Sequence, residues 1–111
     1  MKALIVTASL VIAAPACAEI TGNQLHELCQ SSRGRELAFM YAAGVTDATK
    51  TLMEGLAAMQ MICFPAGVSN QQVVDLVCNS VRDRPQDRHK IAFSSVSAAL
   101  VGGFPCKPAS Q

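Results

Sequence analysis

Apolar residues recur at helical spacing in four stretches of the chain, and no stretch shows the convincing alternation of a strand. A short first helix is expected around Leu25, Leu28 and Cys29, with Asn23 as its cap. The longest helix is expected over residues 36–56, because apolar positions at intervals of three and four form one stripe. This stripe consists of Leu37, Met40, Tyr41, Gly44, Val45, Ala48 and Leu52.

A glycine lies in the middle of that stripe. Gly44 destabilises a helix interior by about 1 kcal/mol relative to alanine. A small residue on an apolar stripe predicts that another helix crosses closely at this point.

Residues 57–68 are apolar without a clean period, and Pro65 and Gly67 would break a helix. We expect the end of a helix followed by an ordered loop, with Cys63 as its anchor. Apolar surface of this kind marks an interface when it is exposed. The candidate patch consists of Met59, Met61, Ile62 and Phe64.

The third helix is expected to begin after Ser69, because Ser69 and Gln72 have the spacing of a capping box. Its apolar stripe consists of Val73, Val74, Val77 and Val81. A charged turn follows, and Pro85 suits the first turn of the last helix. The last stripe consists of Ala92, Val96, Ala99, Leu100 and Gly103, so this helix should pack closely against its neighbours.

The first 18 residues have the pattern of a cleaved secretion signal. Lys2 precedes an apolar stretch over residues 3–14, and small residues at 16 and 18 suit a cleavage site after Ala18. The apolar stretch is shorter than the roughly 20 residues of a membrane span. Acylation of Cys17, as in a lipoprotein, is the alternative, but residues 14–16 match that motif poorly.

Cleavage would leave one domain over residues 19–111, located in the periplasm and without a membrane segment. That mature chain carries eight basic and eight acidic side chains and lacks tryptophan. A nucleic-acid-binding protein normally shows a basic face and stacking aromatics, so this partner class is not expected.

Four cysteines remain after cleavage: Cys29, Cys63, Cys78 and Cys106. An even number in a short exported chain indicates two disulfides, although buried thiols are the alternative. The predicted fold is therefore an all-α bundle of four to five helices held by two disulfides.

The sequence offers no catalytic set of residues, no metal-ligand motif and no cofactor motif. A nucleophile needs a base within hydrogen-bond reach, and the two histidines, His26 and His89, fit exposed helix positions better than a catalytic role. Neither a Cys-x-x-Cys pair nor a glycine-rich phosphate loop occurs. We therefore expect a binding protein, not an enzyme.

Six short motifs, taken in order, resemble the Rap/Tai immunity family of type VI secretion. The resemblance covers nearly all of the mature chain. The motifs are residues 22–29 (GNQLHELC), 41–48 (YAAGVTDA), 63–69 (CFPAGVS), 72–74 (QVV), 85–89 (PQDRH) and 99–106 (ALVGGFPC).

The resemblance implies a periplasmic helical protein, typically a homodimer, that binds and inhibits a secreted amidase which cuts peptidoglycan peptides. For a dimer, the candidate contact is the apolar patch at residues 59–64. The most charged turn is the candidate toxin contact, although a merely solvated turn is an equal alternative. It consists of Arg82, Asp83, Arg84, Gln86 and Asp87. Two other functions stay open: a small periplasmic chaperone of the acid-stress kind, and a carrier of an apolar ligand.

The chain departs from the family at Ala38, where relatives often carry a cysteine, and has Cys78 instead. Short connections make the second, third and last helices run up, down and up. The end of the last helix then lies near Cys63, and the end of the third lies near Cys29. The expected pairs are therefore Cys63–Cys106 and Cys29–Cys78, each closing a loop worth about 4 kcal/mol in chain entropy.

Overall fold

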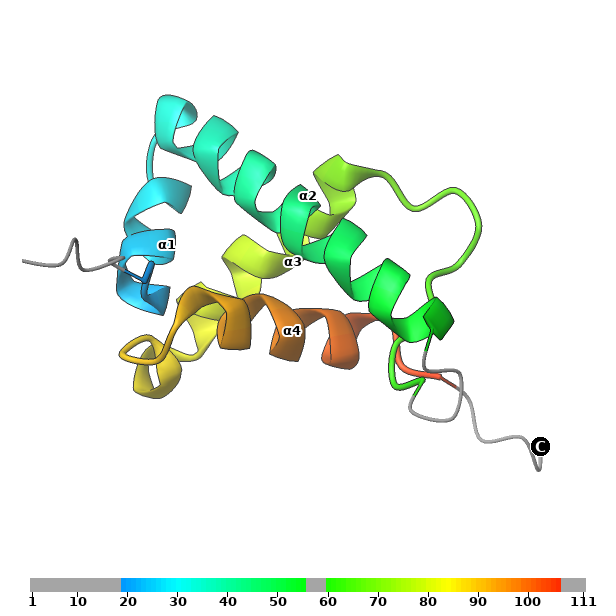
Figure 1. Cartoon of the computed structure of the whole chain (residues 1–111). Coiled ribbons are helices and arrows are strands. Elements are labelled where there is room, and N and C mark those ends of the chain that lie inside the picture. Colours follow the sequence, from blue (N-terminus) through cyan, green and yellow to red (C-terminus); the bar gives the residue numbers. More distant parts are fainter. Residues whose placement is uncertain (1–18, 56–59, 107–111) are drawn as a thin grey trace, which may run out of the picture.

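The computed structural model describes residues 19–55 and 60–106 and is all-α, as the sequence predicts. Four α-helices and one short 3₁₀ helix follow one another along the chain (Figure 1). Their bounds are Gly22–Cys29 for α1, Ser32–Gly55 for α2, Asn70–Asp83 for α3, Pro85–Asp87 for η2 and Ala92–Gly103 for α4. Among the described residues, the only β pairing consists of two isolated bridges, Thr21 with Ile91 and Ile62 with Pro105.

Thr21, and not Asn23, caps the first helix. Its hydroxyl accepts a hydrogen bond from the Gln24 backbone, and the Gln24 side chain accepts from the Thr21 backbone, which completes a capping box. The cap lies two residues earlier than predicted because Gly22 is already helical. A Cβ on Gly22 would lie 2.9 Å from backbone atoms of Arg88, so only glycine fits between α1 and the turn before α4.

The long helix α2 buries a different face from the one that its apolar stripe predicts. The buried positions are small: Gly34, Ala38, Ala42, Thr46 and Thr49. Among the predicted stripe residues, Leu37, Met40 and Leu52 are more than half exposed. Small side chains let α1 and α3 approach the helix axis closely, and the large side chains therefore point outward.

Helix α3 supplies the centre of the core. Ser69 and Gln72 form the predicted capping box, and the valine stripe on α3 is buried. These valines pack with Leu25 of α1 and Leu100 of α4, both of which are fully buried. The valines therefore belong to a helix in spite of their β-branching, because tertiary packing outweighs a weak local preference.

The last helix begins at Ala92 and not at Pro85 as predicted. Pro85 starts η2 instead, and the segment between η2 and α4 pairs with the beginning of α1. The Gly22 amide donates to the Lys90 carbonyl at 2.9 Å, and the Asn23 amide donates to the Arg88 carbonyl at 2.8 Å. Those carbonyls serve α1, so they are not available to a helix that continues from Pro85.

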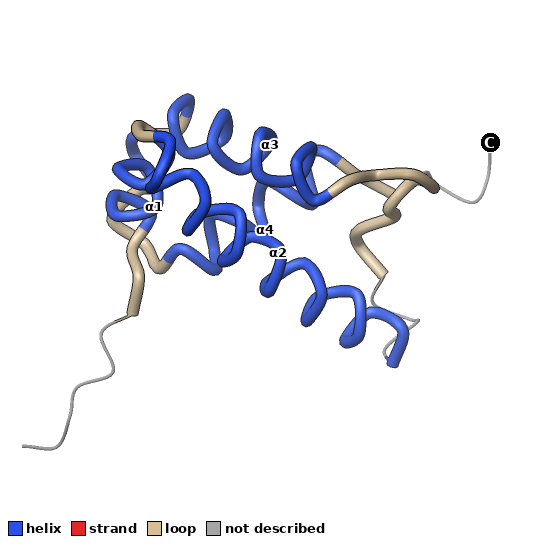
Figure 2. Tube along the Cα trace, turned by 90° about the horizontal axis from the view of Figure 1, so that it is seen from above, coloured by secondary structure: helices blue, strands red, loops and turns tan. Residues whose placement is uncertain are grey.

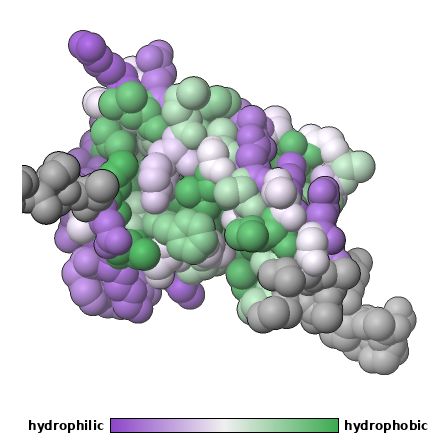
Figure 3. Space-filling view, in the orientation of Figure 1, coloured by the Kyte–Doolittle hydropathy of each residue, from purple (hydrophilic) through white to green (hydrophobic). Residues whose placement is uncertain are grey.

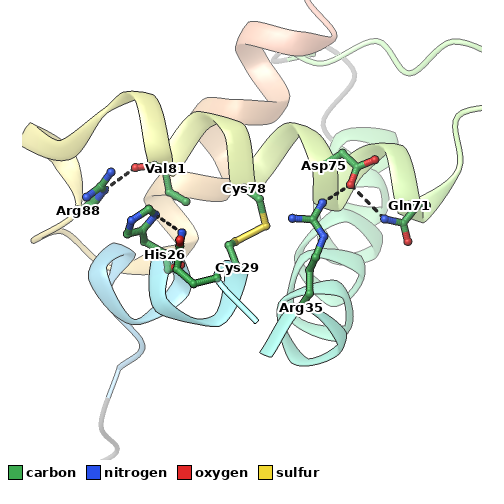
Figure 4. Close-up of a disulfide and its surroundings, with 9 residues drawn as sticks. His26, Cys29, Arg35, Gln71, Asp75, Cys78, Val81 and Arg88 are labelled. Atoms are coloured by element: carbon green, nitrogen blue, oxygen red, sulfur yellow. Dashed lines mark hydrogen bonds and ion pairs between the residues drawn. A yellow bond between two sulfur atoms is a disulfide. The ribbon is translucent and has the colours of Figure 1, made fainter. Parts of the chain in front are cut away.

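Two disulfides lie at opposite ends of the bundle, in the pairing that the helix order predicts. Cys29 at the end of α1 bonds to Cys78 of α3 (Figure 4), and Cys63 in the α2–α3 connection bonds to Cys106 after α4. Seen from above, α2 and α3 lie close together near α1 and spread apart toward the other end (Figure 2). The Cys63–Cys106 bond ties the chain together at that open end. In the part of the chain that the structure describes, no helix is long and apolar enough to cross a membrane.

Candidate protein-binding surface

The charged turn singled out in the sequence lies at the end of α3 and in η2, beside the beginning of α1. Arg82, Asp83, Arg84 and Gln86 are exposed, and Asp87 is half-buried. The structure therefore brings all five residues onto one projecting turn, which forms a hydrophilic area of the surface (Figure 3). We call residues 82–90 the charged turn.

Arg88 holds the charged turn in shape. Its Nε donates to the Val81 carbonyl at 2.5 Å, and its Nη2 donates to the Arg82 carbonyl at 2.7 Å. The last carbonyls of a helix have no partner within the helix and carry its negative dipole end, so a guanidinium bonded to them is favourable. Figure 4 shows Arg88 reaching back to Val81 across the end of α3.

Backbone bonds fix the same turn to the start of α1 and to the start of α4. Besides the two α1 bonds to Arg88 and Lys90, the Ala92 amide donates to the Ile20 carbonyl at 2.6 Å. The side chains of the charged turn therefore project from a rigid base. Rigid presentation lowers the ordering cost of binding, which favours a recognition role.

Two ion pairs set the charge pattern of this surface. Arg82 pairs with Asp83 at 2.9 Å, and this hydrogen bond raises the pKa of Arg82 and lowers that of Asp83. Lys90 pairs with Asp87 at 2.8 Å and lowers the pKa of that carboxyl. Within residues 19–55 and 60–106, neither Arg84 nor Arg88 has an ion-pair partner, so the turn carries a net positive charge.

A small pocket of about 130 Å³ lies behind the turn, between α3 and α4. Its lining is mostly polar and consists of Ser80, Val81, Arg84, Asp87, Arg88, Lys90, Ser94, Ser95 and Ala98. Three cationic side chains against one carboxylate give it a positive balance. Such a pocket suits a carboxylate or a backbone carbonyl from a partner, because guanidinium groups bind these acceptors in a fixed geometry.

The apolar patch predicted at residues 59–64 does not form one exposed surface. Met61 is 59% exposed, but Ile62 is 3% exposed and belongs to the core. Phe64 is half-buried, with its ring 5.3 Å from the Phe104 ring and the Lys50 ammonium 4.7 Å above it. Met59 lies outside the described residues. The prediction of an exposed Ile62 is wrong because the Ile62–Pro105 bridge and the nearby disulfide pull this strand-like segment inward.

The histidines take the positions of ordinary surface residues. His26 is partly exposed on α1, with Nδ1 3.5 Å from the Gln30 amide nitrogen, and His89 is exposed in the charged turn. Within the described part of the chain, no cluster of histidine, cysteine and carboxylate side chains could hold a metal ion. Ile62 and Phe64, but not Met61, line one pocket of about 340 Å³, in which Lys50, Glu54 and Gln60 are polar lining residues.

The sequence pattern does not identify the role of Arg88 and Lys90 in holding the charged turn, because it places both residues in the first turn of the last helix. A signal was present: an arginine a few residues after a helix end reaches the last carbonyls of that helix. The expectation of a continuous helix from Pro85 places Arg88 inside that helix, so it does not include a contact with the end of α3.

The comparisons with known proteins give one match. A family model described as Rap1a immunity proteins matches residues 21–106, from the cap of α1 to the last cysteine. No curated protein and no solved structure matches the chain.

Proposed function

The chain belongs to the Rap1a immunity protein family, and from this premise we propose that it binds and inhibits a secreted peptidoglycan amidase of a type VI secretion system. Immunity proteins act by binding an effector toxin, and the family is typically non-enzymatic. The match over residues 21–106 is the observation that carries the proposal, because it spans every helix and both disulfides. The amidase class comes from the resemblance of the six motifs.

The site of action that we propose is the periplasm, reached through the secretion signal at residues 1–18. Two disulfides in a chain of 111 residues support an oxidising compartment. An amidase that cuts peptidoglycan acts in this same compartment. An inhibitor placed there meets the toxin before the cell wall is cut. We also propose that the protein acts as a homodimer.

The charged turn is the surface that we propose for toxin binding. Arg82 and Arg84 are exposed, the backbone of the turn is fixed at both ends, and its pocket has a positive balance. Arginine is enriched among the residues that carry most of the energy of an interface. We propose that Arg82 and Arg84 contact carboxylates or carbonyls at the rim of the amidase cleft, so that the inhibitor covers the cleft.

Replacing both Arg82 and Arg84 with glutamate should weaken binding of the amidase more than tenfold, which is about 1.4 kcal/mol. The two positive charges then become negative, while the core and both disulfides are untouched. The binding constant is measured by titration calorimetry with a purified type VI amidase.

A matched control separates charge from position. Arg84→Glu and Lys50→Glu make the same change of charge, but Lys50 lies on α2 near the Cys63 connection. Arg84→Glu should weaken binding and Lys50→Glu should not. Equal effects, or none from the Arg82/Arg84 pair, would remove the charged turn from the toxin contact.

A further inference from the structure

Helix α2 carries an apolar stripe that faces solvent. Leu37, Met40 and Leu52 are 57%, 69% and 59% exposed, and Gly44 and Ala48 between them are exposed as well. At roughly 100° per residue these five positions fall within one side of the helix. From Leu37 to Leu52 the stripe is about 22 Å long at 1.5 Å per residue. The face is therefore a line of apolar side chains without a partner among the described residues.

Gly44 lies at the centre of this stripe, and packing among the described residues does not require a glycine there. A Cβ built on Gly44 meets nothing within 4 Å. By contrast, a Cβ on Gly34 would meet the Leu28 carbonyl oxygen at 2.4 Å, so that glycine is required for packing. A glycine in an exposed helix interior weakens the helix, and no packing contact among the described residues offsets this loss. The position suits the close approach of a second helix.

The surrounding surface continues the apolar character. Helix α4 packs against α2 and exposes Phe93 by 48%. In the view of Figure 3, apolar side chains lie over α4 and, interleaved with polar ones, along α2. A contiguous apolar surface bordered by polar groups marks a site of association.

Charges at the two ends of α2 indicate which partner covers the apolar stripe. Arg33 and Glu54 are both exposed, and within residues 19–55 and 60–106 neither has an ion-pair partner. Arg33 is eleven positions before Gly44 and Glu54 is ten positions after it. In an antiparallel pair of α2 helices related by a two-fold axis at Gly44, each Arg33 comes beside the Glu54 of the other copy. Opposite charges meet at both ends of such a pair.

We propose that a second copy of this chain docks on the α2 stripe, with the two α2 helices antiparallel and crossing at Gly44. This inference rests on the homodimer proposed above and assigns its interface and register. The interface is isologous, so each residue faces the one equally far on the other side of Gly44.

The register also matches large side chains with small ones. Seven positions on either side of Gly44, Leu37 faces Thr51 of the second copy. Four positions on either side, Met40 faces Ala48. Leu37 and Met40 therefore each meet a small side chain of the second copy, which is how two helix surfaces interdigitate.

The first test introduces a charged side chain into the α2 stripe. Leu37→Glu should raise the dimer dissociation constant of the exported chain at least tenfold, as measured by sedimentation equilibrium. Leu37 is more than half exposed, so the monomer keeps its fold, which circular dichroism checks. Met61→Glu is the matched control, because Met61 is equally exposed at 59% but lies outside α2. Dissociation by Met61→Glu and not by Leu37→Glu would overturn the proposal, as would a wild-type monomer at high micromolar concentration.

The second test addresses the register. Arg33→Glu should weaken the dimer, and the double exchange Arg33→Glu with Glu54→Arg should restore it, since the pair is then reversed and intact. Gly44→Cys should form a disulfide between two copies on oxidation, because the two-fold axis brings the Cα atoms within bonding range. No rescue and no cross-link would contradict this crossing.

The dimer and the toxin contact fail independently. Leu37→Glu is judged by sedimentation alone, and the Arg82/Arg84 exchange is judged by amidase binding alone. A dimer that binds no amidase overturns the proposed function and supports the interface. A wild-type protein that is monomeric and still inhibits overturns the interface and supports the function.

Discussion

A single buried hydroxyl in α2 lowers the stability of the fold. Thr46 is 1% exposed, and its Oγ1 has no hydrogen-bond partner among the described residues. A buried polar group without a partner lowers stability by about 1–3 kcal/mol. Thr46 lies in a helix interior in close contact with neighbouring side chains. The shape of threonine therefore suits the site, but its hydroxyl does not.

Thr46→Val should therefore raise the free energy of unfolding by about 1–2 kcal/mol, because it removes the unpaired hydroxyl and keeps the shape. Urea denaturation monitored by circular dichroism measures the change. Thr51→Val is the control, since the Thr51 hydroxyl is exposed and donates to the Asp47 carbonyl. A loss of stability in Thr46→Val would mean that this hydroxyl has a partner after all.

Two glycines of the same helix should respond in opposite ways to alanine. Gly34→Ala should destabilise the fold by about 1–3 kcal/mol, because the new Cβ meets backbone atoms of Leu28 that cannot move aside. Gly44→Ala should stabilise the monomer by up to about 1 kcal/mol through helix propensity alone. Both are measured on dilute protein, where association is weak. Equal destabilisation would contradict the open space at Gly44.

At the scale of elements, the sequence predicts the helices well and their orientation less well. Periodicity identifies all four helices, and the capping box of α3 is found at the predicted residues. The error lies in α2, where the large apolar residues were assigned to the core. The core contains Gly34, Ala38 and Ala42 instead. Periodicity shows that a helix has an apolar face but not which element covers that face. Helix α2 has one face of small side chains and one face of large apolar side chains, and either face could be the buried one.

The same limit explains the charged turn. Its exposed residues are predicted from composition, but the backbone bonds that hold it come from amides of α1, which lie far away in the sequence. The Cys29–Cys78 and Cys63–Cys106 pairing could be derived because it depends on helix order alone. The burial of Ile62 depends on the tail after α4, so no local pattern reports it.

Removing the two disulfides separately should lower the unfolding free energy by similar amounts, because the closed loops span 49 and 43 residues, but should loosen different regions first. Cys29→Ser with Cys78→Ser unties α1 from the core helix, and we expect a loss of about 4 kcal/mol in unfolding free energy from chain entropy. Cys63→Ser with Cys106→Ser should lower the unfolding free energy by a similar amount, and the amides of residues 60–69 should exchange before those of α1 and α3, because that bond closes the open end. Exchange measured by mass spectrometry distinguishes the two. Exchange of the α1 amides before those of residues 60–69 in the second variant would contradict this division.

The molecule as a whole has one rigid charged end and one apolar face. The charged turn lies where α1, α3 and α4 meet, and the α2 stripe lies on a different part of the surface. An inhibitor with this arrangement can bind an enzyme at the turn while a second copy covers the stripe. Function thus follows from what the fold leaves outside the core: a few arginines held by Arg88, and a helix face that the monomer does not use.

The ion pairs of the charged turn add a small acid-dependent contribution to the stability of the molecule. The hydrogen bonds from Arg82 and Lys90 lower the pKa values of Asp83 and Asp87, so the stabilisation they give is present above the unfolded-state pKa, about 4. It is lost as the pH falls through the lower folded values. Stability should therefore be constant from pH 7 to about 5 and fall only below about 4. Urea midpoints across this range test the expectation, and a large loss between pH 7 and 5 would favour an acid-activated chaperone.

Titration of a peptidoglycan amidase with this protein tests the central claim most directly. The exported chain is added in steps to a purified type VI amidase, and the release of cut cross-link peptides is followed by chromatography. We predict that activity falls linearly and is abolished near one equivalent of inhibitor for the cognate enzyme. We also predict that the Arg82→Glu/Arg84→Glu variant needs more than a tenfold higher concentration for the same effect. Full activity of every such amidase in the presence of a tenfold excess of the protein would contradict the account.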